Sequence, residues 1–266
     1  ARVPADRLSL GLSVARWHQR EHGVDIELSN GETGRASHLI GADGIHSTLR
    51  EQLGSTHDLR VSHQWCWRTV LPGQPLGEEG LEVFDGRHRL GTFSIGPNQT
   101  YLYWVESGLT QAPDVSARDV RELDRFGALA APLAEGWSSE LNWLCHPLND
   151  RPVYWGRGNV ALIGDAAHPV TPNMGQGAAL AMEDAWYLGR LLNHRREQAA
   201  PGLKRCRQAR VQRVRRLSWL AGRIAHWRWQ PARWVRDQTY TRLPAHHLLR
   251  SQTRFVNHFI KEMDHV

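Results

Sequence analysis

A carboxylate at the end of an apolar segment, followed by closely spaced glycines, is the pattern in this chain with the clearest chemistry. Residues 159–177 read NVALIGDAAHPVTPNMGQG, and Asp165 directly follows the apolar part. A carboxylate in that position can accept hydrogen bonds from ribose or ribityl hydroxyls. Gly175 and Gly177 precede a segment with helical periodicity, so backbone N–H groups there can approach an anionic ligand closely. The segment therefore predicts a site for a nucleotide cofactor.

An earlier segment has the same order of strand, glycine turn and helix. Residues 36–50 read ASHLIGADGIHSTLR, with Asp43 and Gly44 at the predicted turn and Arg50 one helical turn after Ser47. In isolation, the turn is as consistent with a structural role as with a binding role. Arg50 is equally suited to bind a ligand charge and to form an internal salt bridge. The segment alone does not distinguish a structural role from a ligand-binding role.

Together, the two segments resemble the FAD-dependent class A aromatic monooxygenases, the para-hydroxybenzoate hydroxylase-like family. The family pattern GADGxxSxxR is matched from Gly41 to Arg50, and GDAAHxxxPxxGQG is matched from Gly164 to Gly177, in the family's order. The resemblance implies an α/β fold. It consists of a partial Rossmann-like FAD-binding domain with an inserted antiparallel β-sheet substrate domain and a helical C-terminal tail.

The resemblance also implies how the cofactor is held and what it does. In the family, oxygen transfer comes from a flavin C4a-hydroperoxide, so no catalytic side chain is expected and His168 is assigned to the motif loop. NAD(P)H is the expected co-substrate and O2 the oxidant. The implied cofactor-binding residues are Asp43, Gly44, Arg50, Gly164, Asp165, Pro172, Met174, Gly175, Gln176 and Gly177.

A third family pattern, GxGxxG after a strand, has no match in the chain. The acid expected after the following strand, which would hold the adenosine ribose, also has no counterpart. Truncation of the chain is the favoured interpretation. A first βαβ unit supplied by another chain and a degenerate relative are the alternatives. All three bear on whether the chain retains FAD.

The region between the two motifs is rich in aromatic residues. An aromatic pocket above the flavin would suit an aromatic or related apolar substrate, whereas packing of a sheet explains most of these residues individually. The sequence therefore favours a monooxygenase that hydroxylates such a substrate. A flavin-dependent epoxidase or halogenase of the same superfamily, and a non-catalytic remnant or peripheral binding protein, are the alternatives. The candidate substrate contacts are Trp67, Phe93, Tyr103 and His146.

Hydrophobic periodicity predicts the organisation of the chain. The FAD-binding domain is predicted over 1–54 and 151–200, the substrate-domain sheet over 55–150, and a helical tail over 201–266. The individual elements follow from periods of two and 3.6 residues and from turn residues. They are a hairpin over 8–16 and 22–29, strands over 37–40, 141–148 and 159–163, and helices over 116–135, 177–193 and 203–228, the last stopped or kinked by Pro231.

The tail combines arginines with tryptophans. Such a mixture can indicate a helix on a membrane surface. The favoured interpretation is that the arginines form the solvated face of a helix whose apolar side packs on the rest of the protein. Weak membrane contact is therefore a minor hypothesis, and nucleic acid is not expected as a partner. The cationic residues are Arg205, Arg207, Arg210, Arg213, Arg215 and Arg216, the tryptophans are Trp219, Trp227, Trp229 and Trp234, and the apolar side is Leu203, Val214, Leu217, Leu220 and Ile224.

Composition narrows the class of protein. The chain has 266 residues, a net charge of +6, 41% hydrophobic and 23% charged residues, and a mean hydropathy of −0.52. These values are typical of a globular protein, and the sequence has no apolar run of membrane-spanning length and no secretory signal. Cys66, Cys145 and Cys206 are isolated, so neither a disulfide framework nor a zinc site is indicated. A cytoplasmic protein without a metal is expected.

Overall fold

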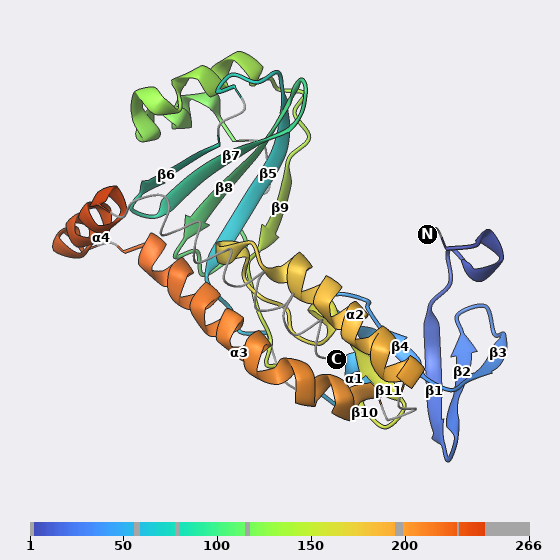
Figure 1. Ribbon diagram of the computed structural model, residues 1–266. Coiled ribbons are helices and arrows are strands. Elements are labelled where there is room, and N and C mark those ends of the chain that lie inside the picture. The colour runs from blue at the N-terminus through green and yellow to red at the C-terminus, as the bar shows by residue number, and fades with distance from the viewer. Residues whose placement is uncertain are drawn as a thin grey trace.

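The computed structural model describes residues 3–55, 59–77, 80–114, 118–194, 199–227 and 229–242. Three sheets and several helices form an elongated molecule (Figure 1). A small N-terminal sheet lies at one end, a large sheet lies at the other, and the long helix α3 runs between them. The α/β fold with an inserted antiparallel sheet and a helical tail is therefore confirmed.

The N-terminal sheet is an antiparallel meander. Strands β1 (Val14–Arg20) and β2 (Gly23–Leu28) form the predicted hairpin, and β3 (Thr33–Ala36) pairs with the far side of β2. The first strand was predicted from residue 8, but its ladder with β2 begins only at the pair Val14↔Leu28. Residues 8–13 have no partner strand among the described residues, and Leu10 is 82% exposed.

A second small sheet brings the two sequence motifs together. Strand β4 (Leu39–Gly41) pairs in parallel with β11 (Val160–Leu162), and β10 (Gly156–Arg157) pairs antiparallel with β11. The register places Leu162 opposite Gly41. Because both strands run in the same direction, their carboxyl ends meet at one edge of the sheet. The two motif turns therefore lie side by side although more than a hundred residues separate them in sequence.

Short helices follow both motif strands. Helix α1 (Thr48–Gln52) comes after β4, whereas β11 leads into the 3-10 turns η4 (Gly164–Ala166) and η5 (Pro172–Met174). Helix α2 (Gly177–His194) then begins at Gly177, the last glycine of the second motif, and agrees closely with the helix predicted over 177–193.

The large sheet has five antiparallel strands in the order β6-β7-β8-β5-β9. Their bounds are β5 (Gln64–Pro72), β6 (Leu81–Asp85), β7 (His88–Gly96), β8 (Gln99–Ser107) and β9 (Leu144–Pro147). One face is covered by the 3-10 segments η2 (Val120–Leu129) and η3 (Ala131–Gly136) (Figure 1). The helix predicted over 116–135 is observed as the 3-10 segments η2 and η3, and Gly127, with φ 70° and ψ −165°, interrupts the helical backbone within η2. Residues 115–117 lie outside the described residues.

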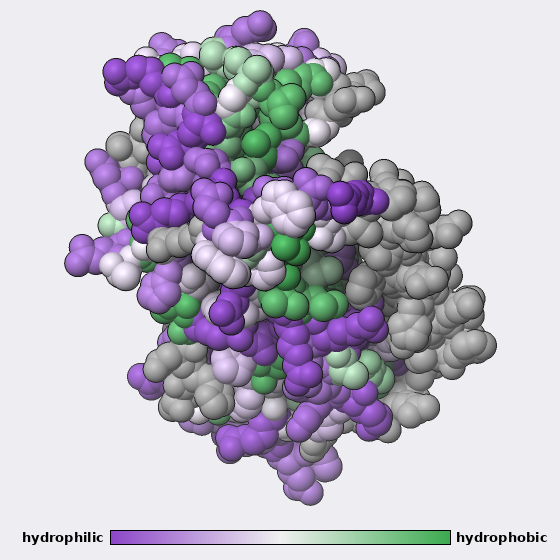
Figure 2. All heavy atoms as spheres, turned by 90° about the vertical axis from the view of Figure 1, so that its left-hand side faces the viewer, coloured by the Kyte–Doolittle hydropathy of each residue, from purple (hydrophilic) through white to green (hydrophobic). Residues whose placement is uncertain are grey.

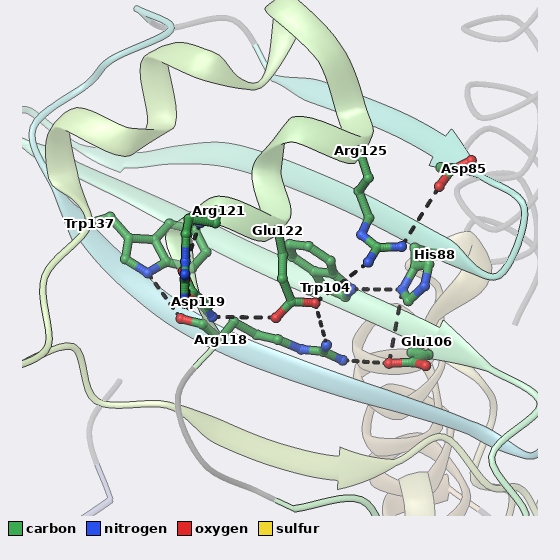
Figure 3. A network of polar contacts seen from close by, with 10 residues as sticks. All are labelled: Asp85, His88, Trp104, Glu106, Arg118, Asp119, Arg121, Glu122, Arg125 and Trp137. Carbon is green, nitrogen blue, oxygen red and sulfur yellow. Dashed lines mark hydrogen bonds and ion pairs between the residues drawn. The ribbon is translucent and has the colours of Figure 1, made fainter.

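The covered face of the large sheet is held by apolar packing and a polar network. Trp67, Trp104 and Phe126 belong to one buried cluster between the sheet and η2. Above it, Arg118 donates to Glu106 at 2.7 Å and to Glu122 at 3.0 Å (Figure 3). The Arg118 guanidinium also lies 3.7 Å from the ring centroid of Trp67. The network and the cluster fix this face of the sheet as packed interior.

The tail differs from the prediction in two respects. Helix α3 (Ala199–Ala225) ends before residue 228, and Pro231 lies in the first turn of a further helix, α4 (Gln230–Arg242), where its missing N–H costs no helical hydrogen bond. On α3, Leu203 and Val214 are buried as expected, but Leu220 is 52% exposed. The predicted solvated face also contains Arg207, which is completely buried.

The face of the molecule that includes α4 is largely hydrophilic, with hydrophobic patches between polar side chains (Figure 2). Among the described residues, no helix has the length and hydropathy needed to cross a membrane. The division of the chain at residues 54, 150 and 200 stays a prediction; α3 starts at Ala199, close to the third of these positions.

Candidate cofactor and substrate site

The first motif turn is organised around the start of α1. Ser47 accepts a hydrogen bond from the backbone N–H of Arg50 at 3.0 Å, and an oxygen of Asp43 lies 3.3 Å from the N–H of Leu49. Both side chains therefore cap helix N–H groups that have no helical acceptor. Gly44 has φ 79° and leaves the backbone of the turn uncovered. The Asp43 carboxylate is thus partly engaged by its own helix.

Arg50 anchors α1 to the second motif. Its guanidinium donates to the carbonyls of Pro152 at 2.6 Å, Ala166 at 3.2 Å and Ala167 at 3.3 Å, and it has no exposed surface. Burial lowers the pKa of Arg50 to about 10, which still leaves it charged at neutral pH. Among the described residues Arg50 forms no internal salt bridge and holds the GDAAH loop instead. A direct contact of Arg50 with the cofactor stays a prediction.

Asp165 points away from this packing. Its side chain is exposed at the end of β11 and lies on the walls of two adjoining cavities. Partial desolvation by these walls raises the pKa of Asp165, and the opposing effect of His168 is smaller. Its carboxylate is available to accept hydrogen bonds from a ligand.

A buried ionic network supports the loop that carries Asp165. Asp184 on α2 accepts the N–H of Gly164 at 3.0 Å and faces His168 Nε2 at 2.5 Å with the same oxygen. Because a carboxylate only accepts, His168 donates through Nε2. The other oxygen of Asp184 accepts from Arg207 Nε at 2.9 Å. His168 is thus held as part of the loop, in line with its assignment.

A second acid extends the network. Glu183 pairs with Arg207 at 2.6 Å and with Arg210 on the next turn of α3, so two carboxylates face two guanidinium groups. Burial alone would raise the pKa of Asp184, but the hydrogen bonds from His168 and Arg207 outweigh it and hold that pKa below its ordinary value. The network joins α2, α3 and the loop in one charge-balanced unit.

Sequence reasoning missed this network. Glu183 and Asp184 were read only as part of a helix, and Arg207 as part of a solvated face. One signal was present: the adjacent acids lie among the apolar residues of α2, and α3 carries arginines one turn apart. Paired acids and bases on neighbouring amphipathic helices are consistent with a buried ion-pair network.

The first cavity lies at the meeting point of the motif turns and has a volume of about 550 Å³. Most of its walls are glycine or alanine, so backbone groups are within reach of an occupant. A side chain on Gly44 or Gly175 would project into open space here, since no described atom lies within 4 Å of either hypothetical Cβ. The lining residues are Ala42, Gly44, Ile163, Gly164, Asp165, Val170, Pro172, Gly175, Gly177, Ala178 and Ala181.

The start of α2 contributes its own electrostatics to the first cavity. Gly177 and Ala178 are in the first turn of an 18-residue helix, and the carbonyl of Gln176 accepts the N–H of Leu180 at 3.0 Å. The N-terminus of such a helix favours negative charge. Gly175 has φ 61°, a conformation that favours glycine, and turns the chain into the helix.

The second cavity has a volume of about 780 Å³ and lies between the loop and the open face of the large sheet. Asp165, Val170, Pro172 and Gly175 belong to the walls of both cavities, so the loop separates them. Met174 lines the second cavity. From the sheet come Cys66, Arg68, Glu82, Arg89, Phe93, Tyr101, Tyr103, Val105 and His146.

Three of the four candidate substrate contacts line the second cavity, namely Phe93, Tyr103 and His146. The structure corrects the fourth. Trp67 alternates with Cys66 and Arg68 along β5 and therefore lies on the opposite face, where it is 98% buried under Arg118. Sequence composition identified the aromatic strand but could not assign the face.

The first cavity fits the flavin nucleotide that the motifs imply. A broad planar ring system and its ribityl chain need walls without large side chains, a hydroxyl acceptor and a positive helix end. The walls without large side chains come from Gly44, Gly164, Gly175 and Gly177. The hydroxyl acceptor is Asp165, and the positive helix end is the N-terminus of α2. A Cβ on Gly164 would lie 3.1 Å from that of Ala181, so the close approach of the loop to α2 requires glycine.

The fold and these two cavities define an α/β protein with a glycine-lined cavity suited to a nucleotide cofactor beside a separate cavity lined by the large sheet. Comparison with known families agrees, since residues 13–218 match the FAD binding domain family. The chain belongs to this family, that of the FAD-dependent class A aromatic monooxygenases.

Several curated relatives are similar over most of the chain. The chain is 34% identical to 2-heptyl-3-hydroxy-4(1H)-quinolone synthase of Pseudomonas aeruginosa over 90% of this chain and 65% of that protein. It is also 34% identical to aurachin C monooxygenase/isomerase of Stigmatella aurantiaca over 89% of this chain and 64% of that protein. The chain thus spans slightly less than two thirds of the length of these relatives.

Solved structures show the same fold. HpxO of Klebsiella pneumoniae, crystallised with FAD and uric acid, superposes with a TM-score of 0.77 over 93% of this chain and 67% of its own, at 24% identity. A salicylate hydroxylase in complex with substrate superposes with a TM-score of 0.69 over 85% of this chain and 64% of its own, at 22% identity. The fold is therefore that of known FAD proteins.

Metal chemistry has no support in the part of the chain that the structure describes, because no group of three or more His, Cys, Asp or Glu side chains there is suited to hold an ion. The three cysteines are free, and burial raises the pKa of the Cys66 thiol to about 11. A protonated thiol is a poor nucleophile.

We expect Asp184→Asn to lower the free energy of unfolding by about 3 kcal/mol at pH 7, because His168 loses its buried carboxylate acceptor and Arg207 loses one of its two carboxylate partners. The folded-state pKa of Asp184 lies below its unfolded value, so its contribution is complete above about pH 4 and is lost as the pH falls through the folded pKa. Urea unfolding between pH 3 and pH 7 should therefore show a flatter acid limb in the variant.

The matched control is Asp124→Asn, which changes an exposed acid on η2. It should leave both the stability and its pH dependence close to those of the parent protein. Equal stability of Asp184→Asn and the parent at pH 7 would contradict the role given to the network.

Proposed function

We propose that the protein is an FAD-dependent monooxygenase that uses NAD(P)H and O2 to hydroxylate an aromatic or related apolar substrate. One observation carries the proposal: the loop of residues 165–175 forms a wall of both the glycine-lined cavity and the aromatic cavity. A cofactor in the first cavity would thus lie next to a substrate in the second.

The residues of this chain have distinct tasks in that arrangement. Asp165 would accept hydrogen bonds from cofactor hydroxyls, and the N–H groups at the start of α2 would stabilise negative charge at the cofactor ring. The sheet and the proline-containing loop would shield the reacting atoms from water. FAD supplies the reduction by NAD(P)H and the activation of O2, chemistry that side chains do not provide.

The names of the relatives support the class of substrate. They include a quinolone synthase, 3-amino-4-hydroxybenzoate 2-monooxygenase PtmB3 of Streptomyces platensis and 6-hydroxynicotinate 3-monooxygenase of Pseudomonas fluorescens. Each of these names describes an aromatic ring with oxygen substituents. We therefore propose a small aromatic ring compound as the substrate, and a cytoplasmic location where NAD(P)H is available.

A weak contact of α4 with a membrane surface is a further proposal about partners. Trp229, directly before α4, is 72% exposed; on α4 itself Trp234 is 63% and Val235 51% exposed, and Arg233 and Arg242 lie on the same helix. Exposed tryptophans flanked by arginines suit the interface of an anionic bilayer. Such a contact would bring the protein close to apolar substrates dissolved in the membrane.

We expect Asp165→Ala to weaken FAD binding by at least about tenfold, because a cofactor hydroxyl loses a charged acceptor. FAD titration followed by flavin fluorescence measures the dissociation constant. Asp165 is exposed, so folding should be unaffected, and Asp124→Ala provides a matched change of an acid far from the cavities. Retention of the parent affinity in Asp165→Ala would refute the assignment.

For the membrane contact, we expect the double variant Trp234→Ser/Val235→Ser to reduce co-sedimentation with phosphatidylglycerol vesicles several-fold at low salt. Leu10→Ser is the control, since Leu10 is 82% exposed and precedes β1, which lies at the opposite end of the molecule from α4 (Figure 1). Equal sedimentation of the double variant and the parent protein would exclude α4 as the contact.

A further inference from the structure

We infer that Arg68 and His146 form a pair of hydrogen-bond donors in the 780 Å³ cavity that selects aromatic substrates carrying an anionic oxygen, such as a carboxylate. The inference rests on the proposed function for the identity of the cavity as the substrate site. It goes further by naming the substituent that the site recognises and the residues that recognise it.

The strand register brings the two side chains together. Cys66 on β5 pairs with His146 on β9, and Arg68 pairs with Leu144, so Arg68 and His146 are diagonal neighbours on the cavity face. An NH2 group of Arg68 lies 2.9 Å from Nδ1 of His146. The contact thus follows from the pairing of two strands and not from a flexible loop.

The chemistry of this contact fixes the tautomer of His146. The guanidinium of arginine has only donors, so Nδ1 of His146 must accept and its proton must reside on Nε2. The remaining Nε2–H of His146 and the remaining N–H groups of Arg68 are all donors. The pair therefore offers an occupant donors and one positive charge, and it suits a group that only accepts hydrogen bonds.

Arg68 also has capacity left for a ligand. Its Nε is buried and has no hydrogen-bond acceptor among the described residues. Its recorded partners, His146 and Tyr101, are uncharged groups in this arrangement. A guanidinium with a buried, unpaired Nε–H and no acidic partner among the described residues favours an anionic oxygen over a neutral one.

The other polar groups of the sheet do not compete for this role. Gly91 lies opposite Tyr103, and a Cβ there would come within 2.1 Å of the Tyr103 ring, so the missing side chain lets that ring lie across β7. Tyr103 then donates its hydroxyl to Glu82 at 2.5 Å, and burial beside that acid raises the pKa of Tyr103. Tyr103 contributes its ring to the cavity, but its hydroxyl proton is already donated to Glu82 and is not available to a ligand.

Arg89 differs from Arg68 because an acid lies beside it, although its Nε also has no hydrogen-bond acceptor among the described residues. Its Nε lies 3.8 Å from Glu82, and its guanidinium is 5.5 Å from the ring centroid of Tyr103. Phe93 is stacked against Tyr103 at 6.0 Å between ring centroids and is 53% exposed. The sheet therefore presents a flat aromatic surface with one uncompensated cationic group, Arg68, beside it.

An aromatic surface with a cationic group beside it suits a planar substrate that carries an anionic substituent. Its ring would pack against Phe93 and Tyr103, and its anionic oxygen would lie between Arg68 and Nε2 of His146. The loop that separates the cavities would then face the ring from the cofactor side. The position of the anionic substituent would thereby orient the ring toward the cofactor.

The test compares acids with their neutral amides as binding probes. Isothermal titration calorimetry with salicylate and anthranilate, and with salicylamide and anthranilamide, measures affinity without turnover. We expect the parent protein to bind each acid at least about tenfold more tightly than its amide. Arg68→Met should reduce this ratio to near one, and Arg68→Lys should retain part of it because the charge remains.

Substitutions of His146 test the tautomer. His146→Gln keeps one acceptor and one donor and should preserve the preference, whereas His146→Phe should reduce it. Arg16→Met, which removes an exposed arginine from β1, is the control and should leave the ratio unchanged. Thermal unfolding of each variant establishes that the sheet is intact.

The outcomes separate this inference from the proposed function. Equal affinity for acid and amide in the parent protein, binding of neither probe, or an unchanged ratio in Arg68→Met would overturn the inference even if FAD binds. Conversely, absence of FAD binding together with a preference that depends on Arg68 would overturn the proposed function and leave the anion site standing.

Discussion

The carboxylate of Asp184 is the interaction on which the arrangement of both cavities depends. One of its oxygens receives the N–H of Gly164 and the ring of His168, and the other receives Arg207. It therefore fixes the strand-end turn, the following loop, α2 and α3 relative to one another. Parallel pairing of β4 with β11 brings the first motif to the same edge, and Arg50 closes the connection by holding carbonyls of the loop. Asp165 can remain exposed because its neighbours are fixed in this way.

The loop between Asp165 and Gly175 links two kinds of recognition. On one side are glycines and a helix N-terminus, which suit a nucleotide; on the other is a sheet with aromatic rings and the Arg68–His146 pair, which suits a planar ring. Fixed elements support both sides, since strand pairing places Arg68 and His146 and the ionic network places the loop. The distance between cofactor and substrate would thus be determined by packing and not by side-chain flexibility.

Much of this could be predicted from the sequence, because the motifs specify local conformations. Gly164, Asp165, Gly175 and Gly177 lie at the cavity, and α2 begins at Gly177 as the periodicity predicts. Three features could not be predicted. The face of β5 on which Trp67 lies depends on strand register, the buried state of Arg207 depends on α2, and the acceptors of Arg50 are carbonyls of a loop distant in sequence. Each depends on long-range partners that a local pattern does not encode.

The central claim is that the cavity at the meeting point of the two motifs holds FAD. The most direct measurement is the visible absorbance of the protein after incubation with excess FAD and removal of free cofactor by gel filtration. We expect flavin bands that correspond to about one FAD per chain and a spectrum that is perturbed relative to free FAD. Protein that elutes folded and colourless from this procedure would contradict it.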